Sequence, residues 1–194
     1  MSLIRSYLPD SVNHYFMYYV GKVRCIVQPY VNTTFSASQI NDNIYLGDLA
    51  SASNLTAMKE QGITHILSVF NGTVELYPEH FTYKIIHIND DVWVDISKYF
   101  DESIQFMDSV LANENNRLLI HCQRGVSRSV TLLLAYKVWE INNKQKINYE
   151  NIDIVIDTCI KKIQSHRDIA DPNEGFKKCV KKYICKLNNY DYFD

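Results

Sequence analysis

The sequence predicts an α/β domain with a central mixed, mostly parallel sheet flanked by helices. Three apolar runs rich in β-branched residues, at positions 63–69, 83–88 and 117–121, have the length and composition of buried strands. An amphipathic helix at residues 97–113 separates the last two runs. Strands that alternate with helices usually pair in parallel and are covered by those helices, which is the basis of this fold class.

The other elements follow from the same signals along the chain. Residues 44–46 read as a short strand that ends at a glycine. Residues 51–61 read as a helix with Gly62 just past its end, and its N-cap is expected at Ser51 or Ser53. Beyond residue 121 the chain is predicted to be helical, at residues 127–140, 148–164 and, after a turn at 171–173, 174–187.

The length of 194 residues accommodates one domain with short extensions. We expect an N-terminal extension at residues 1–39, a main domain at residues 40–187 and a tail at residues 188–194. Within the extension, the aromatic-rich residues 15–20 suit either a helix or an interface. This run is too short to cross a bilayer, and residues 1–10 lack the pattern of a signal peptide.

The composition indicates a globular protein without a general affinity for polyanions. Apolar residues make up 46% of the chain, and 20 basic against 22 acidic residues give a net charge of −2. This balance gives no reason to expect nucleic-acid or membrane binding, so an anionic substrate needs a local site. The five cysteines are odd in number and lack zinc-site or disulfide spacing, which indicates a reducing compartment: the cytoplasm, with the nucleus as an alternative. The histidines show no ligand-like grouping, so no metal site is expected.

The most informative segment is His-Cys-Gln-Arg-Gly-Val-Ser-Arg-Ser, at residues 121–129. It follows an apolar strand and opens an apolar helix, and open α/β sheets bind ligands at such junctions. A loop there can turn successive backbone N–H groups inward, and the helix dipole adds positive potential at the same point. We therefore expect a site for a tetrahedral phosphate. Its predicted substrate-binding residues are Gln123, Arg124, Gly125, Val126, Ser127 and Arg128.

Cys122 and Arg128, six residues apart, can meet across this closed loop. The guanidinium of Arg128 offers a planar pair of donors to two phosphate oxygens and stabilises a thiolate. The pKa of a free thiol is about 8.5 and sites of this kind lower it to roughly 3.5–7.5, so Cys122 is the predicted nucleophile. The Ser129 hydroxyl is placed to hydrogen-bond the sulfur and help it leave. Gly125 allows backbone angles that other residues avoid, and His121 is expected to order the loop.

The leaving oxygen needs an acid, because an alkoxide or phenoxide leaves poorly. The Asn-Asp-Asp segment at residues 89–91 follows the strand at 83–88 and therefore lies at the same edge of the sheet. Asp90 or Asp91 could donate a proton to the leaving oxygen and then act as a base towards water. Desolvation by an apolar neighbour such as Trp93 would help to keep this acid protonated.

Residues 121–129 resemble the active-site signature of the protein tyrosine phosphatase superfamily, and their Gly-Val-Ser-Arg-Ser ending resembles its dual-specificity branch. The likeness extends over most of the chain, through residues 44–47, 62–67, 95–100, 135–136 and 172–173. It implies a protein tyrosine phosphatase-like fold and a metal-free, two-step hydrolysis, with Cys122 as nucleophile and Arg128 as phosphate binder. Aligned on these segments, Asp90 matches the general acid of the family, and Asp91 is one position away.

The resemblance implies a dual-specificity protein phosphatase that acts on a phosphorylated protein and needs no cofactor. Residues 71–81 could wall the pocket and are short, whereas relatives that accept only phosphotyrosine use longer insertions. A shallow cleft would also admit phosphoserine and phosphothreonine. Two alternatives stay open: a phosphatase for a phosphoinositide or an RNA 5′-triphosphate, and a pseudophosphatase that binds phosphoproteins without turnover. Some family members dimerise through an N-terminal helix, so the extension is a candidate homodimer interface.

Overall fold

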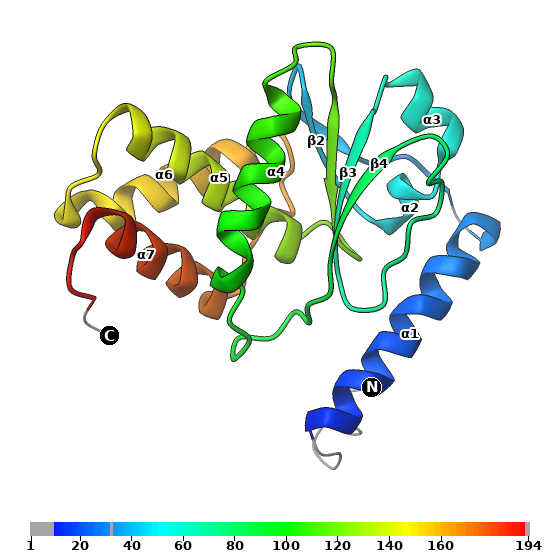
Figure 1. Cartoon of the computed structure of the whole chain (residues 1–194), viewed down its shortest axis with the longest axis horizontal. Helices are drawn as coiled ribbons and strands as arrows, with labels where there is room; N and C mark the ends of the chain where they lie inside the picture. Colours follow the sequence, from blue (N-terminus) through cyan, green and yellow to red (C-terminus); the bar gives the residue numbers. More distant parts are fainter. Residues whose placement is uncertain (1–9, 32, 193–194) are drawn as a thin grey trace.

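The computed structural model describes residues 10–31 and 33–192, which form a five-stranded sheet with helices on both faces (Figure 1). The strand order is β1-β2-β5-β3-β4, and β1 is antiparallel to β2 while all other neighbours are parallel. The predicted fold class is confirmed. The strands are β1 (Ser38–Asn41), β2 (Ile44–Gly47), β3 (His65–Val69), β4 (Thr82–Ile86) and β5 (Leu118–His121). The expectations for residues 1–9, 32 and 193–194 lie outside the described residues.

The strands send alternate side chains to the two faces of the sheet. In β5, Leu118 and Ile120 pack into the larger core, whereas Leu119 packs into a smaller core on the opposite face. Leu67 and Ile66 of β3 are divided in the same way. Both faces are therefore buried, which explains why these runs are apolar throughout instead of alternating with polar residues.

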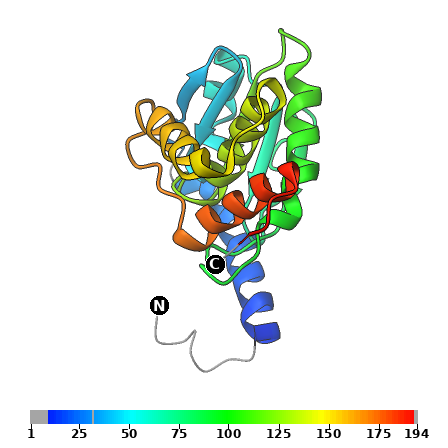
Figure 2. The ribbon, with the colours of Figure 1, turned by 90° about the vertical axis from the view of Figure 1, so that its left-hand side faces the viewer.

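Different helices cover the two faces of the sheet (Figure 1). The larger core is covered by α4 (Phe100–Leu111), α5 (Arg128–Lys144), α6 (Ile152–Gln164) and α7 (Glu174–Asn188). The opposite side carries α1 (Asp10–Val31), α2 (Leu49–Ala52) and α3 (Leu55–Glu60). Short 3₁₀ turns, η1 (Ser97–Tyr99) and η2 (Tyr149–Asn151), precede α4 and α6. Figure 2 views the molecule from the side of α6 and α7.

The prediction of one helix at residues 51–61 is wrong, because two short helices replace it. The carboxylate of Asp48 accepts hydrogen bonds from both the backbone N–H and the hydroxyl of Ser51, at 2.9 and 2.7 Å, and so starts α2 before the predicted cap. The side chain of Asn54 then accepts from the N–H of Ala57 and starts α3. Side-chain oxygens that bind N–H groups compete with the helix, so the second cap interrupts it.

The strand β1 has the sequence Ser-Gln-Ile-Asn and begins at Ser38, inside the segment assigned to the extension. Its residues alternate between half-buried and exposed, and it lies at the edge of the sheet. An edge strand this short and polar has no clear signal in the sequence. The division of the chain at residue 40 stays a prediction.

The helix α1 packs closely against the chain that follows β3. A Cβ on Gly21 would lie 1.8 Å from the carbonyl oxygen of Asn71, and one on Gly72 would lie 2.0 Å from that of Tyr18. The thiol of Cys25, on the same side of α1, is 1% exposed. The helix thus rests on glycines, and its first turns, dark blue, extend past the α/β body in both views (Figures 1 and 2). In the described part of the chain, no helix combines the length and the apolar composition that a membrane span needs.

Candidate active site

The segment between β5 and α5 forms a closed loop at the carboxyl edge of the parallel strands, where residues 122–127 connect the two elements. The carbonyl groups of residues 123–126 turn away from the centre of this loop and are bound from outside. Arg167 donates from Nε to carbonyl 125 at 2.7 Å and from Nη2 to carbonyl 124 at 3.3 Å. The carbonyls of residues 123 and 126 accept from the backbone N–H groups of Leu49 and Asp171, at 3.4 and 2.8 Å respectively.

The N–H groups of the loop consequently point inward. In a planar trans peptide the carbonyl and the next N–H point in opposite directions, and the described chain contains no cis peptide. Four outward carbonyls therefore leave the N–H groups of residues 124–127 directed at the centre. The N–H of Gly125 reaches the sulfur of Cys122 at 3.2 Å. Such a ring of donors suits an anion with several oxygens.

Gly125 is required by the shape of this loop. Its φ is +66°, in the left-handed region that side chains disfavour. A Cβ at this position would also lie 2.5 Å from the carbonyl oxygen of Gly47 and 2.6 Å from Nη2 of Arg167. The predicted need for a glycine here therefore has two causes, the backbone angle and the lack of space.

The thiol of Cys122 is buried at the base of the loop and is 1% exposed. Burial alone raises its pKa, but the charge of Arg128, the Ser129 hydroxyl and the backbone N–H groups of Ser129 and Arg124 outweigh burial and lower the pKa below its ordinary value. The Ser129 hydroxyl donates to the sulfur at 3.3 Å. The geometry thus favours a thiolate, the form in which cysteine is a nucleophile.

His121 lies directly before the nucleophile and is buried. Its Nε2 is 2.6 Å from the hydroxyl of Ser68, and its Nδ1 is 3.3 Å from the carbonyl oxygen of Cys122. Burial lowers the pKa of His121 to about 4. A neutral ring that bridges β3 and the loop is placed to order the backbone, and this role of His121 stays a prediction.

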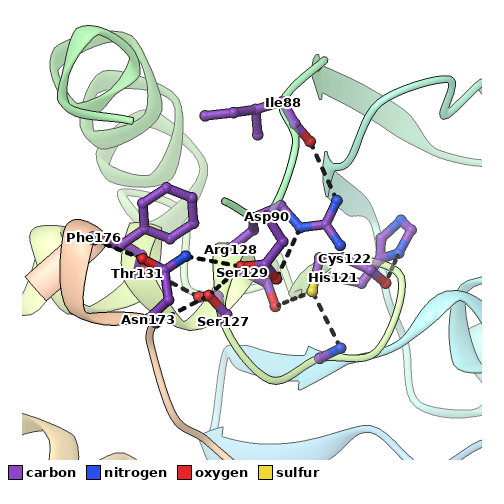
Figure 3. A network of polar contacts seen from close by, with 11 residues as sticks. Ile88, Asp90, His121, Cys122, Ser127, Arg128, Ser129, Thr131, Asn173 and Phe176 are labelled. Carbon is purple, nitrogen blue, oxygen red and sulfur yellow. Dashed lines mark hydrogen bonds and ion pairs between the residues drawn. The ribbon is translucent and has the colours of Figure 1, made fainter. Parts of the chain in front are cut away.

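Arg128 begins α5 and its side chain is turned into the site (Figure 3). Nη1 donates to the carbonyl of Ile88 at 3.2 Å. Nε lies 3.3 Å from Oδ2 of Asp90, close enough for an ion pair, but its N–H is not aimed at that oxygen and makes no hydrogen bond with the described residues. A buried guanidinium N–H without an acceptor can bind a phosphate oxygen.

Asp90 is held over the loop by three side chains (Figure 3). Its Oδ1 accepts from the Ser127 hydroxyl at 2.8 Å and from Nδ2 of Asn173 at 2.9 Å. Asn173 also donates its backbone N–H to Ser127 Oγ at 3.2 Å and caps α7. The third contact of Asp90 is the ion pair of its Oδ2 with Arg128. The carboxylate of Asp90 therefore contacts both the phosphate-binding loop and the residue that caps α7.

Asp91 and Trp93 lie differently from Asp90. Oδ1 of Asp91 accepts from the N–H of Trp93 within their own turn, at 3.1 Å. The indole of Trp93 is 91% exposed. The expectation that Trp93 desolvates the acid is wrong, because the turn at residues 91–94 directs this side chain into solvent, beside the first turns of α7.

Two residues that complete the site have weak signals in the sequence. Arg167 lies 42 residues from the carbonyl it binds at Gly125, in a turn after α6, and only the fold brings the two together. Asn173 is more accessible to sequence reasoning, since an Asp-Pro-Asn turn before a helix indicates an N-cap. Its second contact, to Asp90, bridges 83 residues and depends on the tertiary structure. Among the described residues, no cluster of three or more His, Cys, Asp or Glu is arranged to hold a metal ion.

Known proteins resemble this chain over most of its length. Residues 44–185 match the family model of the dual specificity phosphatase catalytic domain. The chain is 32% identical over 139 residues to dual specificity protein phosphatase 1 of Arabidopsis thaliana, an alignment that covers 72% of this chain and 64% of that protein. It is also 32% identical over 181 residues to dual specificity protein phosphatase 26 of Bos taurus, which covers 87% of this chain and 76% of that protein.

Among solved structures, the Yvh1 phosphatase domain of Chaetomium thermophilum is similar with a TM-score of 0.69 and 26% identity, over 81% of this chain and all of that one. The chain spans somewhat less than two thirds of the length of the Arabidopsis relative. The predicted enzyme class, a hydrolase of the dual-specificity protein phosphatase type with phosphoproteins as substrates, is the class of this family. The chain belongs to the dual-specificity phosphatase family, as its sequence predicts.

Proposed function

We propose that this protein hydrolyses phosphotyrosine, and also phosphoserine and phosphothreonine, in protein substrates through a cysteinyl-phosphate intermediate on Cys122. The observation that carries the proposal is the buried Cys122 sulfur, whose pKa is lowered inside a loop of inward N–H groups beside Arg128. A thiolate at the centre of an anion-binding loop is suited to attack phosphorus.

In the first step, the Cys122 thiolate attacks phosphorus and the bond from phosphorus to the ester oxygen breaks. The loop N–H groups and Arg128 bind the non-bridging oxygens, whose charge they stabilise in the transition state. Asp90 gives its proton to the leaving oxygen. In the second step Asp90 takes a proton from water, the water oxygen attacks phosphorus, and the S–P bond breaks with the Ser129 hydroxyl donating to the sulfur.

Asp90 is proposed as the acid in preference to Asp91. Its carboxylate touches the phosphate-binding loop through Ser127 and Arg128, whereas the Asp91 carboxylate closes a turn with Trp93. Proximity to the reacting atoms is the first requirement for a general acid. The short segment at residues 71–81 supports the broader substrate range, because a shallow cleft lets a phosphoserine side chain reach the sulfur.

The test is a set of hydrolysis assays on phosphotyrosine, phosphoserine and phosphothreonine peptides. A phosphoinositide and a 5′-triphosphorylated RNA are assayed in parallel as the alternative substrates. Wild-type protein should hydrolyse the peptides in the presence of EDTA. Cys122→Ser should abolish turnover while it preserves peptide binding. Preference for the lipid or the RNA would overturn the proposed substrate class. Binding without turnover by the wild type would instead indicate a pseudophosphatase.

We also propose that α1 mediates a homodimer. The apolar residues at positions 16, 19, 23, 26 and 30 of α1 are all at least 49% exposed, and their spacing of three and four is that of a coiled-coil seam. The opposite face of α1 rests on the domain, so this seam is the apolar face of α1 that is available to a second copy. Sedimentation should give a dimer for the wild type and a monomer for a Val23→Glu, Ile26→Glu variant, and a monomeric wild type at micromolar concentration would refute this proposal.

The proposed location is a reducing compartment, the cytoplasm or the nucleus. All five cysteines are free in the described chain, and the mechanism needs the Cys122 thiol in its reduced form. Fluorescence microscopy of the tagged full-length chain in its own cells checks this proposal, which a signal confined to the secretory pathway would overturn.

A further inference from the structure

The helix α1 forms one side of the entrance to the phosphate site. A small pocket there is lined from α1 by Met17, Val20, Gly21 and Arg24, which face Gln123 and Arg128 of the phosphate-binding loop across it. The family match begins at residue 44, so this wall lies outside the catalytic domain that the family shares. Because it reaches the same pocket as Arg128, α1 is placed to contact whatever surrounds a bound phosphate.

The position of α1 at this entrance is well determined by packing. Gly21 and Gly72 bring the two backbones so close that a Cβ on either would collide with a carbonyl oxygen at 2.0 Å or less. One turn further on, Cys25 is buried against Phe70 and Leu49. Residues 21 and 25 thus fix the rotation of the helix, and this rotation turns the half-buried Arg24 to the pocket and leaves Lys22 exposed.

The charge balance of this pocket is one-sided. Its lining contains two arginines and no aspartate or glutamate. Arg128 is paired with Asp90, whereas Arg24 has no ion pair and no side-chain hydrogen bond within the described residues. A half-buried guanidinium without a counterion attracts an anion more strongly than a fully solvated one, because less water screens its charge.

We infer that Arg24 is a specificity-determining residue that binds a second anionic group on the substrate, close to the phosphorylated residue. The group is a carboxylate of Asp or Glu or a second phosphate, since a guanidinium binds either one through two parallel hydrogen bonds. Successive residues of an extended peptide are about 3.3 Å apart, so a side chain one or two positions from the phosphorylated residue spans such an entrance. This inference rests on the proposed phosphatase activity at Cys122.

The test compares three phosphotyrosine peptides that differ only in the flanking residues: acidic, amide-containing, and carrying a second phosphate. It uses the full-length chain as wild type and as Arg24→Ala, Arg24→Lys and Arg24→Glu, with Lys22→Ala as the control on the exposed side of α1. The wild type should show a kcat/KM about 5- to 10-fold higher for the acidic peptide than for the amide peptide, mostly through KM, and more for the doubly phosphorylated one.

Arg24→Ala should remove this preference, Arg24→Glu should reverse it, Arg24→Lys should keep part of it, and Lys22→Ala should keep all of it. Thermal unfolding of each variant checks that α1 stays docked. A preference that survives in Arg24→Ala, or an equal loss on all three peptides, would overturn the inference. Failure of the proposed phosphatase activity would look different, because the wild type would then show no Cys122-dependent hydrolysis of any of the three peptides.

Discussion

The phosphate-binding loop and the acid loop supply the two halves of the proposed chemistry, and they are built in opposite ways. In the phosphate-binding loop, at residues 122–128, the residues Cys122 and Arg128 are 1% and 7% exposed, and successive carbonyls are bound from outside. In the acid loop, at residues 89–94, Val92 and Trp93 are 46% and 91% exposed. The acid loop is held by the contacts of the Asp90 carboxylate and by its backbone at Val92, which lies against Gly175 of α7.

The difference follows from what each loop has to do. Groups that stabilise charge on phosphorus act best when they are already oriented before the substrate arrives, which requires a buried and fully bonded loop. A general acid must approach the leaving oxygen and then release the product, which is easier at the solvent-facing side of the site. A buried anion site and an acid on a loop with exposed side chains are therefore compatible parts of one reaction.

Replacement of Asp90, the carboxylate of the acid loop, should have the largest effect on turnover. Asp90→Ala should lower kcat on a phosphotyrosine peptide by about 10²- to 10³-fold, because a proton donor contributes about that much when the leaving group is poor. On p-nitrophenyl phosphate, whose leaving group is good, the loss should stay below about 10-fold. Asp91→Ala should remain near wild type on both substrates, and steady-state kinetics that reverse the two variants would assign the acid to Asp91.

Arg167 tests whether the phosphate-binding loop is rigid because its carbonyls are held from outside. Arg167→Lys should lower kcat/KM by about 10- to 100-fold, because one ammonium cannot replace the rigid fork that binds two carbonyls of the loop and that of Ser36, and a small displacement of reacting groups is costly. Lys161→Met, an exposed change on α6, is the matched control. Wild-type kinetics in Arg167→Lys, with an unchanged melting temperature, would show that the loop keeps its shape by itself.

Ser129 tests the electrostatic side of the same loop. Its hydroxyl helps to lower the pKa of Cys122, so Ser129→Ala should raise that pKa and move the acidic limb of the kcat/KM profile to higher pH. The loss should be largest at the acidic end of the profile, at most about 5-fold, and smaller at higher pH, since one hydrogen bond to the sulfur contributes about 1 kcal/mol. A profile that drops equally at every pH would instead indicate a role in the second step alone.

A separate effect, on stability and not on catalysis, arises from His121. The pKa of this ring is about 4 in the folded protein, whereas an unfolded histidine titrates near about 6.5. Below about pH 6.5 the His121 ring binds a proton in the unfolded chain but stays neutral in the folded chain. The free energy of unfolding should therefore fall by about 2 kcal/mol between pH 7 and pH 5. Urea titrations of wild type and His121→Asn check this, and parallel pH dependences would contradict the assignment.

The sequence by itself determines the centre of this protein. The strand, the loop and the helix around Cys122 are contiguous, so hydrophobic periodicity and the spacing of Cys122, Gly125, Arg128 and Ser129 are enough to place an anion site at a sheet edge. The parallel strands could be predicted for the same reason, because strands buried on both faces are continuous apolar runs. Family, fold class and class of reaction are all contained in these local patterns.

The tertiary structure alone decides how that centre is supported and what surrounds it. Arg167 reaches Gly125 across 42 residues and Asn173 reaches Asp90 across 83, and no local pattern encodes a contact between such distant positions. The paired caps at Asp48 and Asn54 divided a helix that periodicity alone predicted as one. The rotation of α1, set by close packing at Gly21, decides that Arg24 faces the phosphate site, because a helix presents a given side chain only as its neighbours orient it.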